Sequence, residues 1–592
     1  LQESEEKNGA YFCSYPGFVD CYHIVCRMAE RSGQPAFLML CTLVDGEGMP
    51  LTEDARLDRY MDKLKSAIRS ALRRGDSFTR YGNNQFLVLL VGIRQENCEI
   101  TQSRVSNCFL SYGFRGKISI RYEVYPAAEE NETAGELLFG SEIKSFLAHP
   151  GFKKELNEEQ LPLYLSYQYS PGEDTFFKGV KKLMPAHWLE WKAGQLTVQR
   201  YWQPKFDPDD SRTLEEWEDE ISAAMKESVQ AHKIADVEVG SFLSSGVDSS
   251  YMAALAHVDK TFTVGFANKQ YDETDYAQEF SKHIGVKNYA YRITPEEYWA
   301  NLGKIQYHMD EPLADAASVA LYFVNREASK QVKVCLSGEG ADEFFGGYNI
   351  YKEPFTVTWY DKIPLPIRRA IGAVADLLPP VHGINFLVRR GKPLAERYIG
   401  NTNLMDEHRK KKLLKNYHPG KLPTDLSRPY FELSQGQDAV TQMETCDLNL
   451  WMVGDILLKA DKMSMANSLE LRVPFLDRKV FELASHIPTK CKVNANQTKI
   501  AMRGAAEKTI PAKTADKKKL GFPVPVRAWL RDEQYAGVVR KAFNTPAAEQ
   551  FFRTKELNAM LDQHISGKRD NWRQIWCIFM FLVWYDEYFV KR

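Results

Sequence analysis

Several features that define other classes of protein are missing from this chain of 592 residues. Its longest apolar run, Ile575–Val583, has about nine residues against the roughly 20 of a membrane-spanning helix, so we expect a buried C-terminal helix there. No signal peptide is visible. The 77 basic and 78 acidic residues leave a net charge of −1, so neither a nucleic acid nor a membrane is expected as a partner. The ten cysteines show neither Cx₂C pairs nor a disulfide-like spacing, which predicts reduced core cysteines and a cytoplasmic protein.

The stretch Val237–Ser250 is the first part of the sequence that indicates a binding site. A short β-branched run leads into a loop of small residues, Ser244-Ser245-Gly246-Val247-Asp248-Ser249, and an apolar helical segment follows. A strand, a small-residue loop and a helix together point backbone N–H groups and a positive dipole end at a phosphate. The Walker A pattern is excluded because no GK[ST] follows the loop. The loop resembles instead the S-x-G-x-D-S pyrophosphate loop of ATP pyrophosphatases, which implies binding of the two phosphates that leave when ATP is split into AMP and pyrophosphate. A plain turn is the alternative interpretation of this loop taken alone.

From Leu214 the sequence alternates between helices and short apolar strands, which is typical of a doubly wound parallel sheet. Beyond about Tyr348 it predicts mainly helices. Ligands of such sheets bind beyond the carboxyl ends of the strands, which suits an adenine lying along Val264. The expected strands are Val237–Leu243, Thr261–Phe266, Tyr289–Ile293 and Val332–Leu336.

Three carboxylates, Glu339, Asp342 and Glu343, follow the Val332–Leu336 strand within a glycine-rich stretch. Close carboxylates without a nearby lysine repel one another, and a Mg²⁺ would relieve that repulsion. The pattern therefore favours a metal site over a solvated acidic turn.

Two further stretches mix charges into apolar sequence. In Leu457–Asp477 the charged side chains of Glu470, Arg472 and Asp477 could pair among themselves in a structural ion network. Asp516–Pro525 is a basic run closed by a Gly-Pro-rich turn. It is either a solvated loop or a cation placed against the charge that develops as pyrophosphate departs.

In their order and spacing these stretches resemble the synthetase domain of glutamine-hydrolysing asparagine synthetases, over about residues 205–592. The resemblance implies an ATP pyrophosphatase-type domain that uses ATP and Mg²⁺. It implies that Asp248 and Asp342 hold the metal, that Glu339 is important for forming β-aspartyl-AMP, and that Lys519 faces the transition state. The ATP and pyrophosphate contacts that it implies are Leu243, Ser244, Ser245, Gly246, Val247, Asp248, Ser249, Val264, Ser337 and Gly338.

The implied reaction is an ATP-dependent amide synthesis. Aspartate's side-chain carboxylate attacks the α-phosphorus of ATP, pyrophosphate leaves, and ammonia displaces AMP to give asparagine. Related adenylating synthetases that close β-lactams or peptide macrocycles are the alternative, because the acceptor pocket cannot be identified from one sequence.

The pattern of residues 11–130 predicts a separate α/β sandwich. The expected elements are helices at Gly17–Ser32 and Leu57–Arg74, a strand at Ala36–Val44 and a β-hairpin with a Gly-Asn turn. The segment around the hairpin resembles the GGDEF domain of diguanylate cyclases. At its turn the sequence reads Gly82-Asn83-Asn84-Gln85-Phe86, and Asn and Gln lack the anionic oxygens that hold Mg²⁺. We therefore expect a degenerate, non-cyclising GGDEF-like domain, with an unrelated α/β domain as the alternative.

Residues 136–204 follow an acidic linker and resemble the last quarter of the glutaminase domain of the same synthetases, a small β-domain remnant. Such glutaminases use an N-terminal cysteine as nucleophile, and no residue fits that role because Cys13 is internal. We expect free ammonia, or a glutaminase partner, as the nitrogen source.

The fold class expected from the sequence is thus α/β multi-domain, with regions 11–130, 136–204 and 205–592. Two interpretations of the N-terminal fusion stay open: a nucleotide-sensing module that regulates the synthetase, and a gene rearrangement near residues 126–136. The sequence also leaves the oligomeric state open, and a homodimer is one of the states compatible with it.

Overall fold

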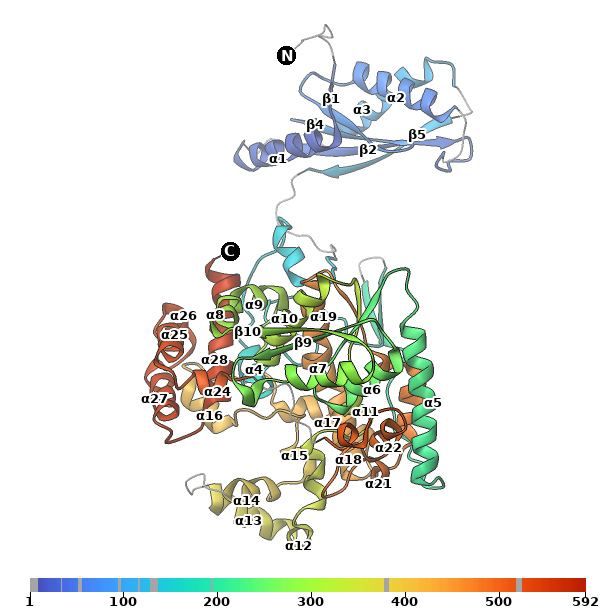
Figure 1. The fold of residues 1–592 in the computed structure, drawn as a ribbon. Coiled ribbons are helices and arrows are strands. Elements are labelled where there is room, and N and C mark those ends of the chain that lie inside the picture. Colours follow the sequence, from blue (N-terminus) through green and yellow to red (C-terminus); the bar gives the residue numbers. More distant parts are fainter. Residues whose placement is uncertain are drawn as a thin grey trace. The chain divides into compact units, whose positions relative to one another are not determined.

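The computed structural model describes residues 9–32, 35–51, 56–93, 97–114, 118–127, 137–192, 195–376, 383–517 and 524–591. The chain divides into two compact units, Leu1–Leu137 and Leu138–Arg592 (Figure 1). Among the described residues, no helix combines the length and the apolar character that crossing a membrane requires.

The first unit is built on a five-stranded sheet with the strand order β1-β3-β4-β2-β5. β3 and β4 form the expected hairpin, and β2 pairs antiparallel with both β4 and β5. The expected helices and strands of residues 11–91 are confirmed with small shifts at their ends. The elements are β1 (Tyr11–Phe12), α1 (Tyr15–Ser32), β2 (Ala36–Asp45), α2 (Leu57–Ala71), β3 (Ser77–Gly82), β4 (Gln85–Val91), α3 (Cys98–Leu110) and β5 (Ile118–Pro126).

The helix α2 ends at Ala71, earlier than the expected Arg74, because a buried carboxylate organises the turn that follows. Asp76 accepts hydrogen bonds from the backbone N–H of Arg73 (3.0 Å) and of Val91 (3.1 Å). These bonds join the end of α2 to the end of β4 and replace the helical hydrogen bonds that α2 would otherwise continue.

Residues 138–204 belong to the second unit and do not form a compact body of their own. Their helix α4 (Gln160–Tyr167) is fully buried, and the hydroxyl of Tyr164 donates a hydrogen bond to the backbone oxygen of Cys577 (2.8 Å) in α28 (Trp572–Tyr585). Their strands β6 (His187–Lys192) and β7 (Gln195–Arg200) pair as an exposed antiparallel hairpin. The region that resembles a glutaminase therefore shares its core with the region 205–592.

The second unit contains a five-stranded sheet in which every strand pairing is parallel, in the order β10-β9-β8-β11-β12. The four expected strands are confirmed. The fifth, β12, lies inside the charged stretch Leu457–Asp477 and pairs with β11 at the edge of the sheet. Its three residues are too few for a pattern of alternation, so only the pairing defines it as a strand. The strands are β8 (Val239–Phe242), β9 (Lys260–Phe266), β10 (Lys287–Ile293), β11 (Val334–Leu336) and β12 (Glu470–Arg472).

Helices cover both faces of this sheet, which confirms the doubly wound arrangement. One core joins α5, α6, α20 and α22, and another joins α9, α10, α19 and α28, which includes the buried apolar run expected near the C-terminus. The helices that follow Arg200 are α5 (Leu214–His232), α6 (Val247–Ala256), α7 (Thr274–His283), α8 (Pro295–Ala300), α9 (Leu302–Met309), α10 (Ala317–Ser329), α11 (Ala341–Phe344), α12 (Thr358–Asp361), α13 (Leu365–Asp376), α14 (Ile384–Arg390), α15 (Leu394–Arg397), α16 (Glu407–Leu413), α17 (Pro423–Leu433), α18 (Ala439–Asn449), α19 (Leu457–Met465), α20 (Arg478–His486), α21 (Thr489–Lys492), α22 (Ile500–Glu507), α23 (Ala512–Ala515), α24 (Val526–Trp529), α25 (Glu533–Phe543), α26 (Pro546–Phe551), α27 (Thr554–Ile565) and α28.

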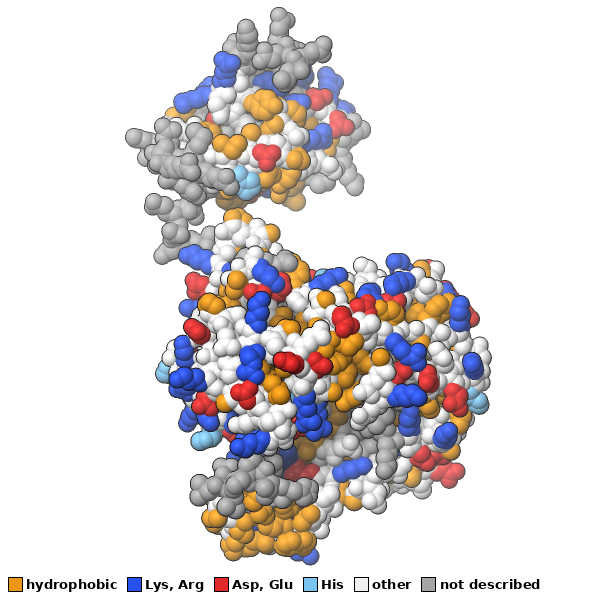
Figure 2. All heavy atoms as spheres, turned by 60° about the vertical axis from the view of Figure 1, so that its left-hand side comes forward, with side chains coloured by type: hydrophobic (Ala, Val, Ile, Leu, Met, Phe, Trp, Pro, Cys, Tyr) orange, Lys and Arg blue, Asp and Glu red, His pale blue; other side chains and the backbone are white. Residues whose placement is uncertain are grey.

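Figure 2 shows hydrophobic side chains gathered at the lower end of the second unit, where Figure 1 places α12 to α14. In α13 the exposed fractions of Ile367 and Val374 are 52% and 63%. The side of α13 that faces the end of α14 has little room for a side chain, since a Cβ at Gly372 would lie 3.3 Å from the Cα of Gly391. Ile367 and Val374 therefore lie on the surface, on a side of α13 that α14 does not cover.

Candidate active site

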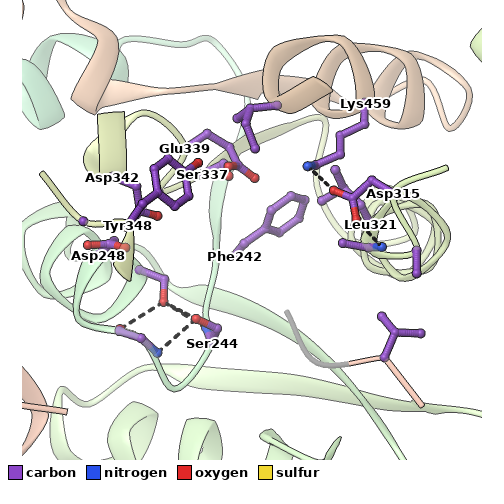
Figure 3. A pocket seen from close by; sticks show the side chains of 18 of the residues that line it. Phe242, Ser244, Asp248, Asp315, Leu321, Ser337, Glu339, Asp342, Tyr348 and Lys459 are labelled. Carbon is purple, nitrogen blue, oxygen red and sulfur yellow. Dashed lines mark hydrogen bonds and ion pairs between the residues drawn. The ribbon is translucent and has the colours of Figure 1, made fainter. Parts of the chain in front are cut away.

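A cavity of about 790 Å³ lies beyond the carboxyl ends of β8 and β11 and along β9 (Figure 3). Loops that leave these strands supply much of its wall, as expected for a parallel α/β sheet. Of the residues singled out in the sequence, Lys519 lies outside the described residues. The structure brings the other twelve together on this one cavity: Leu243, Ser244, Ser245, Gly246, Val247, Asp248, Ser249, Val264, Ser337, Gly338, Glu339 and Asp342.

The loop between β8 and α6 is held in a tight curl by its own serines. The backbone N–H of Ser244 donates to the hydroxyl of Ser249 (3.0 Å), and the two hydroxyls lie 2.8 Å apart. The N–H of Gly246 donates to the hydroxyl of Ser244 (3.1 Å). The curl ends where α6 begins, so the first turn of a ten-residue helix faces the cavity. The loop is therefore a polar turn, fixed by its own serines, on the wall of the cavity.

Asp248 and Asp342 lie next to each other, although they belong to the first turns of two different helices, α6 and α11 (Figure 3). Both contact the ammonium of Lys499, at 2.6 Å and 2.7 Å between Nζ and the nearer carboxylate oxygen. The expectation of close carboxylates without a nearby lysine was wrong. Lys499 precedes α22, far along the chain, and only the packing of α22 against α5 and α6 brings it here.

The three carboxylates after β11 have separate surroundings. Asp342 contacts Lys499, and Glu339 lines the cavity. Glu343 is buried and accepts a hydrogen bond from the hydroxyl of Tyr348, which in turn accepts one from the indole N–H of Trp451 (2.9 Å). Glu343 therefore fixes an aromatic wall of the cavity.

A second charged cluster lies on the cavity wall near Glu339, and the sequence analysis did not identify it as part of the site. Lys459 contacts Asp315 (2.5 Å) and Asp455 (2.6 Å), and Asp455 also accepts from the side-chain amide of Gln168 (2.9 Å). Burial raises the pKa of Asp455 to about 7. Burial also acts to raise the pKa of Asp315, but the neighbouring Lys459 outweighs it and holds that pKa below its usual value. The cluster places one cation between two acids of unequal strength.

Further charged residues line the cavity next to the serine loop. The hydroxyl of Ser245 donates to Glu273, whose pKa is raised by burial. Burial lowers the pKa values of Lys517 and Arg503. Arg503 is fixed by a hydrogen bond from its Nε to the backbone oxygen of Thr498 (2.8 Å). Partly desolvated cations such as these can bind an anionic ligand strongly, because little water competes for them.

Of the ion pairs expected inside Leu457–Asp477, one is present. Arg472 contacts Glu470 (2.7 Å) and also donates to backbone oxygens of residues 232 and 234. Asp477 instead begins α20, where it accepts from the N–H of Lys479 (2.8 Å). These residues lie away from the cavity wall, so their role is structural.

Asp447 lies behind the part of the cavity wall formed by Asn401. Its carboxyl group should make the stability of the fold depend on pH. Its carboxylate accepts from the hydroxyls of Tyr351 (2.6 Å) and Tyr398 (2.5 Å), and burial raises its pKa from 3.8 to about 7. The folded protein therefore holds this proton more tightly than the unfolded chain. The stabilisation is complete below about pH 4 and is lost as the pH rises through about 7.

We expect Asp447→Asn to remove this dependence, since the amide oxygen still accepts from both tyrosines. Across that pH window the variant should gain stability relative to wild type, measured as the urea midpoint of unfolding. Asp210→Asn, at a side chain 74% exposed, is the matched control. Parallel pH profiles for wild type and Asp447→Asn would show that Asp447 ionises normally.

The fold and the cavity define the second unit as an α/β enzyme domain with a ligand site beyond the carboxyl ends of parallel strands. The family model described as asparagine synthase matches residues 220–586, and the one described as glutamine amidotransferase domain matches residues 115–202. The chain belongs to the asparagine synthase family.

Two curated relatives illustrate the similarity. The chain is 39% identical over 492 residues to asparagine synthetase (glutamine-hydrolyzing) 1 of Bacillus subtilis, covering 82% of this chain and 77% of that protein. It is 41% identical over 452 residues to a putative asparagine synthetase (glutamine-hydrolyzing) of Mycobacterium bovis, covering 74% of this chain and 68% of that protein. The amidotransferase match begins before β5 of the first unit, so it spans both units.

A solved structure of a DGC protein from Thermotoga maritima is also similar, with 19% identity and a TM-score of 0.17, over 20% of this chain and 82% of that one. At this TM-score it carries no conclusion about the first unit.

Proposed function

We propose that this protein is an ATP-dependent ligase that converts the side-chain carboxylate of aspartate into an amide. One observation carries the proposal: Asp248 and Asp342, from the first turns of α6 and α11, meet at one edge of the cavity that also contains the curled serine loop. Membership of the asparagine synthase family supports it.

The nucleotide end of the proposed site is the half of the cavity beside the serine loop. The serine hydroxyls of the loop and the N–H groups at the start of α6 would bind the pyrophosphate part of ATP, with Ser337 and Gly338 opposite and Leu243 and Val264 along the adenosine. The cationic side chains of Lys517 and Arg503 line the same part of the cavity. Lys519 stays proposed as the cation that faces the transition state.

Mg²⁺ is the metal that the proposal implies, and the donor set fits it. Mg²⁺ in nucleotide sites is held by one or two carboxylates together with waters and substrate phosphates. Asp248 and Asp342 supply two carboxylates at one edge, and the described residues contain no group of three or more acidic, histidine or cysteine side chains that could hold a metal alone. When bound, the metal would offset the charge of the phosphates.

The acceptor end of the proposed site is the wall formed by Glu339 and the Lys459 cluster. Aspartate carries an α-ammonium and an α-carboxylate besides the carboxylate that reacts. Lys459 and Asp315 offer a charge of each sign on this wall, and Gln168 adds an amide. We propose that this wall orients aspartate with its side-chain carboxylate towards the phosphates.

In the proposed reaction an aspartate carboxylate oxygen attacks the α-phosphorus, and the bond from that phosphorus to the bridging oxygen breaks, releasing pyrophosphate. Ammonia then attacks the acyl carbon of β-aspartyl-AMP, the bond to the AMP oxygen breaks, and a proton is lost. The protein's contribution is to position both substrates and to stabilise the developing charge. Glu339 stays proposed as a residue that the first step needs.

Pyrophosphate release over a panel of carboxylic acids, with ATP and ammonium present, tests this function. We expect aspartate to support release and the other acids to stay near background. Preference for a β-amino acid or a peptide carboxylate would instead show a lactam- or macrocycle-forming relative. With glutamine in place of ammonium we expect no asparagine, and asparagine formed from glutamine alone would contradict the proposed nitrogen source.

For the first unit we propose a degenerate GGDEF-like module without cyclase chemistry. The side chain of Gln85, at the turn of the hairpin, donates to the hydroxyl of Thr42 (3.0 Å), and Arg80 contacts Asp58 (3.2 Å). An amide in this place offers no anionic oxygen for a metal, which supports a role in contacts or regulation.

A further inference from the structure

The Asp248–Asp342 pair already shares a cation of the protein itself, which offsets about half of its charge. The ammonium of Lys499 lies within 2.7 Å of an oxygen of each carboxylate, and the Lys499 side chain is 3% exposed. Such a buried and doubly paired ammonium is held far more firmly than one on the surface.

The backbone around Lys499 is shaped to bring the ammonium to this position. Lys499 has a φ of +56°, in the left-handed region that residues with a side chain rarely adopt. Gly347 lies against the contact between the lysine and the carboxylates. A Cβ at this position would lie 1.9 Å from an oxygen of Asp342 and 2.2 Å from Cε of Lys499. The chain therefore accepts an unusual backbone conformation and a glycine where the lysine meets the carboxylates.

Two cations cannot share these oxygens at low cost. A lysine ammonium and a divalent ion repel each other strongly at such separations where water is largely excluded. Mg²⁺ also loses its hydration water reluctantly, and two carboxylates whose oxygens already contact an ammonium offer it less in return than a free pair would. Free Mg²⁺ should therefore bind poorly while Lys499 holds the pair.

A triphosphate changes this balance because it brings several negative charges into the same cavity. Lys499 itself lines that cavity, so its ammonium can contact phosphate oxygens without crossing the protein interior. The pair of carboxylates then needs a new cation, and the metal that accompanies the nucleotide supplies it.

We propose that Lys499 is a built-in counter-cation that closes the Asp248–Asp342 pair to free Mg²⁺ and opens it only when a polyphosphate enters. This rests on the proposed function in one respect, the assignment of the two aspartates to the metal. It makes the order of binding a property of the protein: the metal enters with the nucleotide rather than before it.

Calorimetric titration with Mg²⁺ alone, and with Mg²⁺ in the presence of pyrophosphate, tests the proposal without turnover. Wild type should bind Mg²⁺ weakly alone and at least about tenfold more tightly with pyrophosphate. Lys499→Met should bind Mg²⁺ alone at least about tenfold more tightly than wild type does. Lys508→Met, at the end of the same helix and outside the cavity wall, is the matched control and should behave as wild type.

Two outcomes would overturn the proposal: wild type that binds Mg²⁺ equally well with and without pyrophosphate, or a Lys499→Met variant that binds it no better than wild type. Lys499→Gln serves if the methionine variant does not fold, and the wild-type comparison needs no variant. Adding Asp342→Asn to Lys499→Met should abolish the new metal binding, and binding that survives this change would also overturn it. A failure of the carboxylate panel would reject the proposed reaction but would leave these titrations unchanged.

Discussion

Asp342→Asn is expected to lower the rate of pyrophosphate release by about 100- to 1000-fold, the usual cost of removing one group that stabilises charge developing at a reacting centre. The asparagine keeps the shape of the side chain but has no anionic oxygen to offer a metal. It also leaves Lys499 with Asp248 as its one remaining carboxylate of the pair. Release of pyrophosphate with saturating ATP, aspartate and ammonium is the measurement.

The matched control is Asp219→Asn, which changes the same side chain on α5 at a position 71% exposed that contacts Lys508. It should leave the rate unchanged. Circular dichroism and the urea midpoint of Asp342→Asn should stay close to those of wild type, so that a lost rate cannot be attributed to unfolding. A rate near that of wild type would remove Asp342 from the reaction.

Lys459→Met is expected to destabilise the second unit by about 3–5 kcal/mol, the range for breaking a buried ion pair from one side. The side chain of Lys459 is 7% exposed and that of Asp455 is fully buried, so no solvent replaces the lost cation. As the pH falls, part of the loss should be recovered, because removal of the lysine raises the pKa of the buried Asp455 further and its carboxylate then takes up a proton. Urea unfolding followed by tryptophan fluorescence at two pH values measures both effects.

Replacing Lys459 together with Asp455 shows whether the lost stability comes from the charge of the lysine or from the packing of its side chain. Lys459→Met combined with Asp455→Asn removes the fully buried acid but keeps an amide oxygen that can accept from Gln168. Asp315 also loses its lysine, but its side chain is 21% exposed and can be solvated, so much of the stability should return. Lys490→Met, at a surface lysine 59% exposed, controls for the change of side chain. If the double variant is as unstable as Lys459→Met, the stability of this wall depends on packing of the lysine stem rather than on its charge.

The serine loop and the strands around it could be predicted from sequence because their signals are local. A β-branched run, six small residues and an apolar helix are consecutive, and each follows from intrinsic conformational preference. The same holds for the hairpin of the first unit and for the apolar helix α28. These patterns describe neighbours along the chain, and twelve of the thirteen predicted site residues accordingly line one cavity.

The charges that complete the cavity show no such local pattern. Lys499 precedes an ordinary amphipathic helix, and Lys459 and Asp455 are spaced as a common i, i+4 pair. Gln168 comes from a segment expected in a different domain. None of these residues is distinguished until α4, α19 and α22 pack around the sheet.

By itself the sequence determined a doubly wound sheet, a loop of small polar residues after its β8 strand and acidic residues after β11, because hydrophobic period and turn chemistry are properties of short segments. Only the tertiary structure decided which cation each carboxylate meets, and that residues 138–204 share the core of the second unit. Electrostatic interaction depends on distance and burial, and both are set by helices that are remote from one another along the chain.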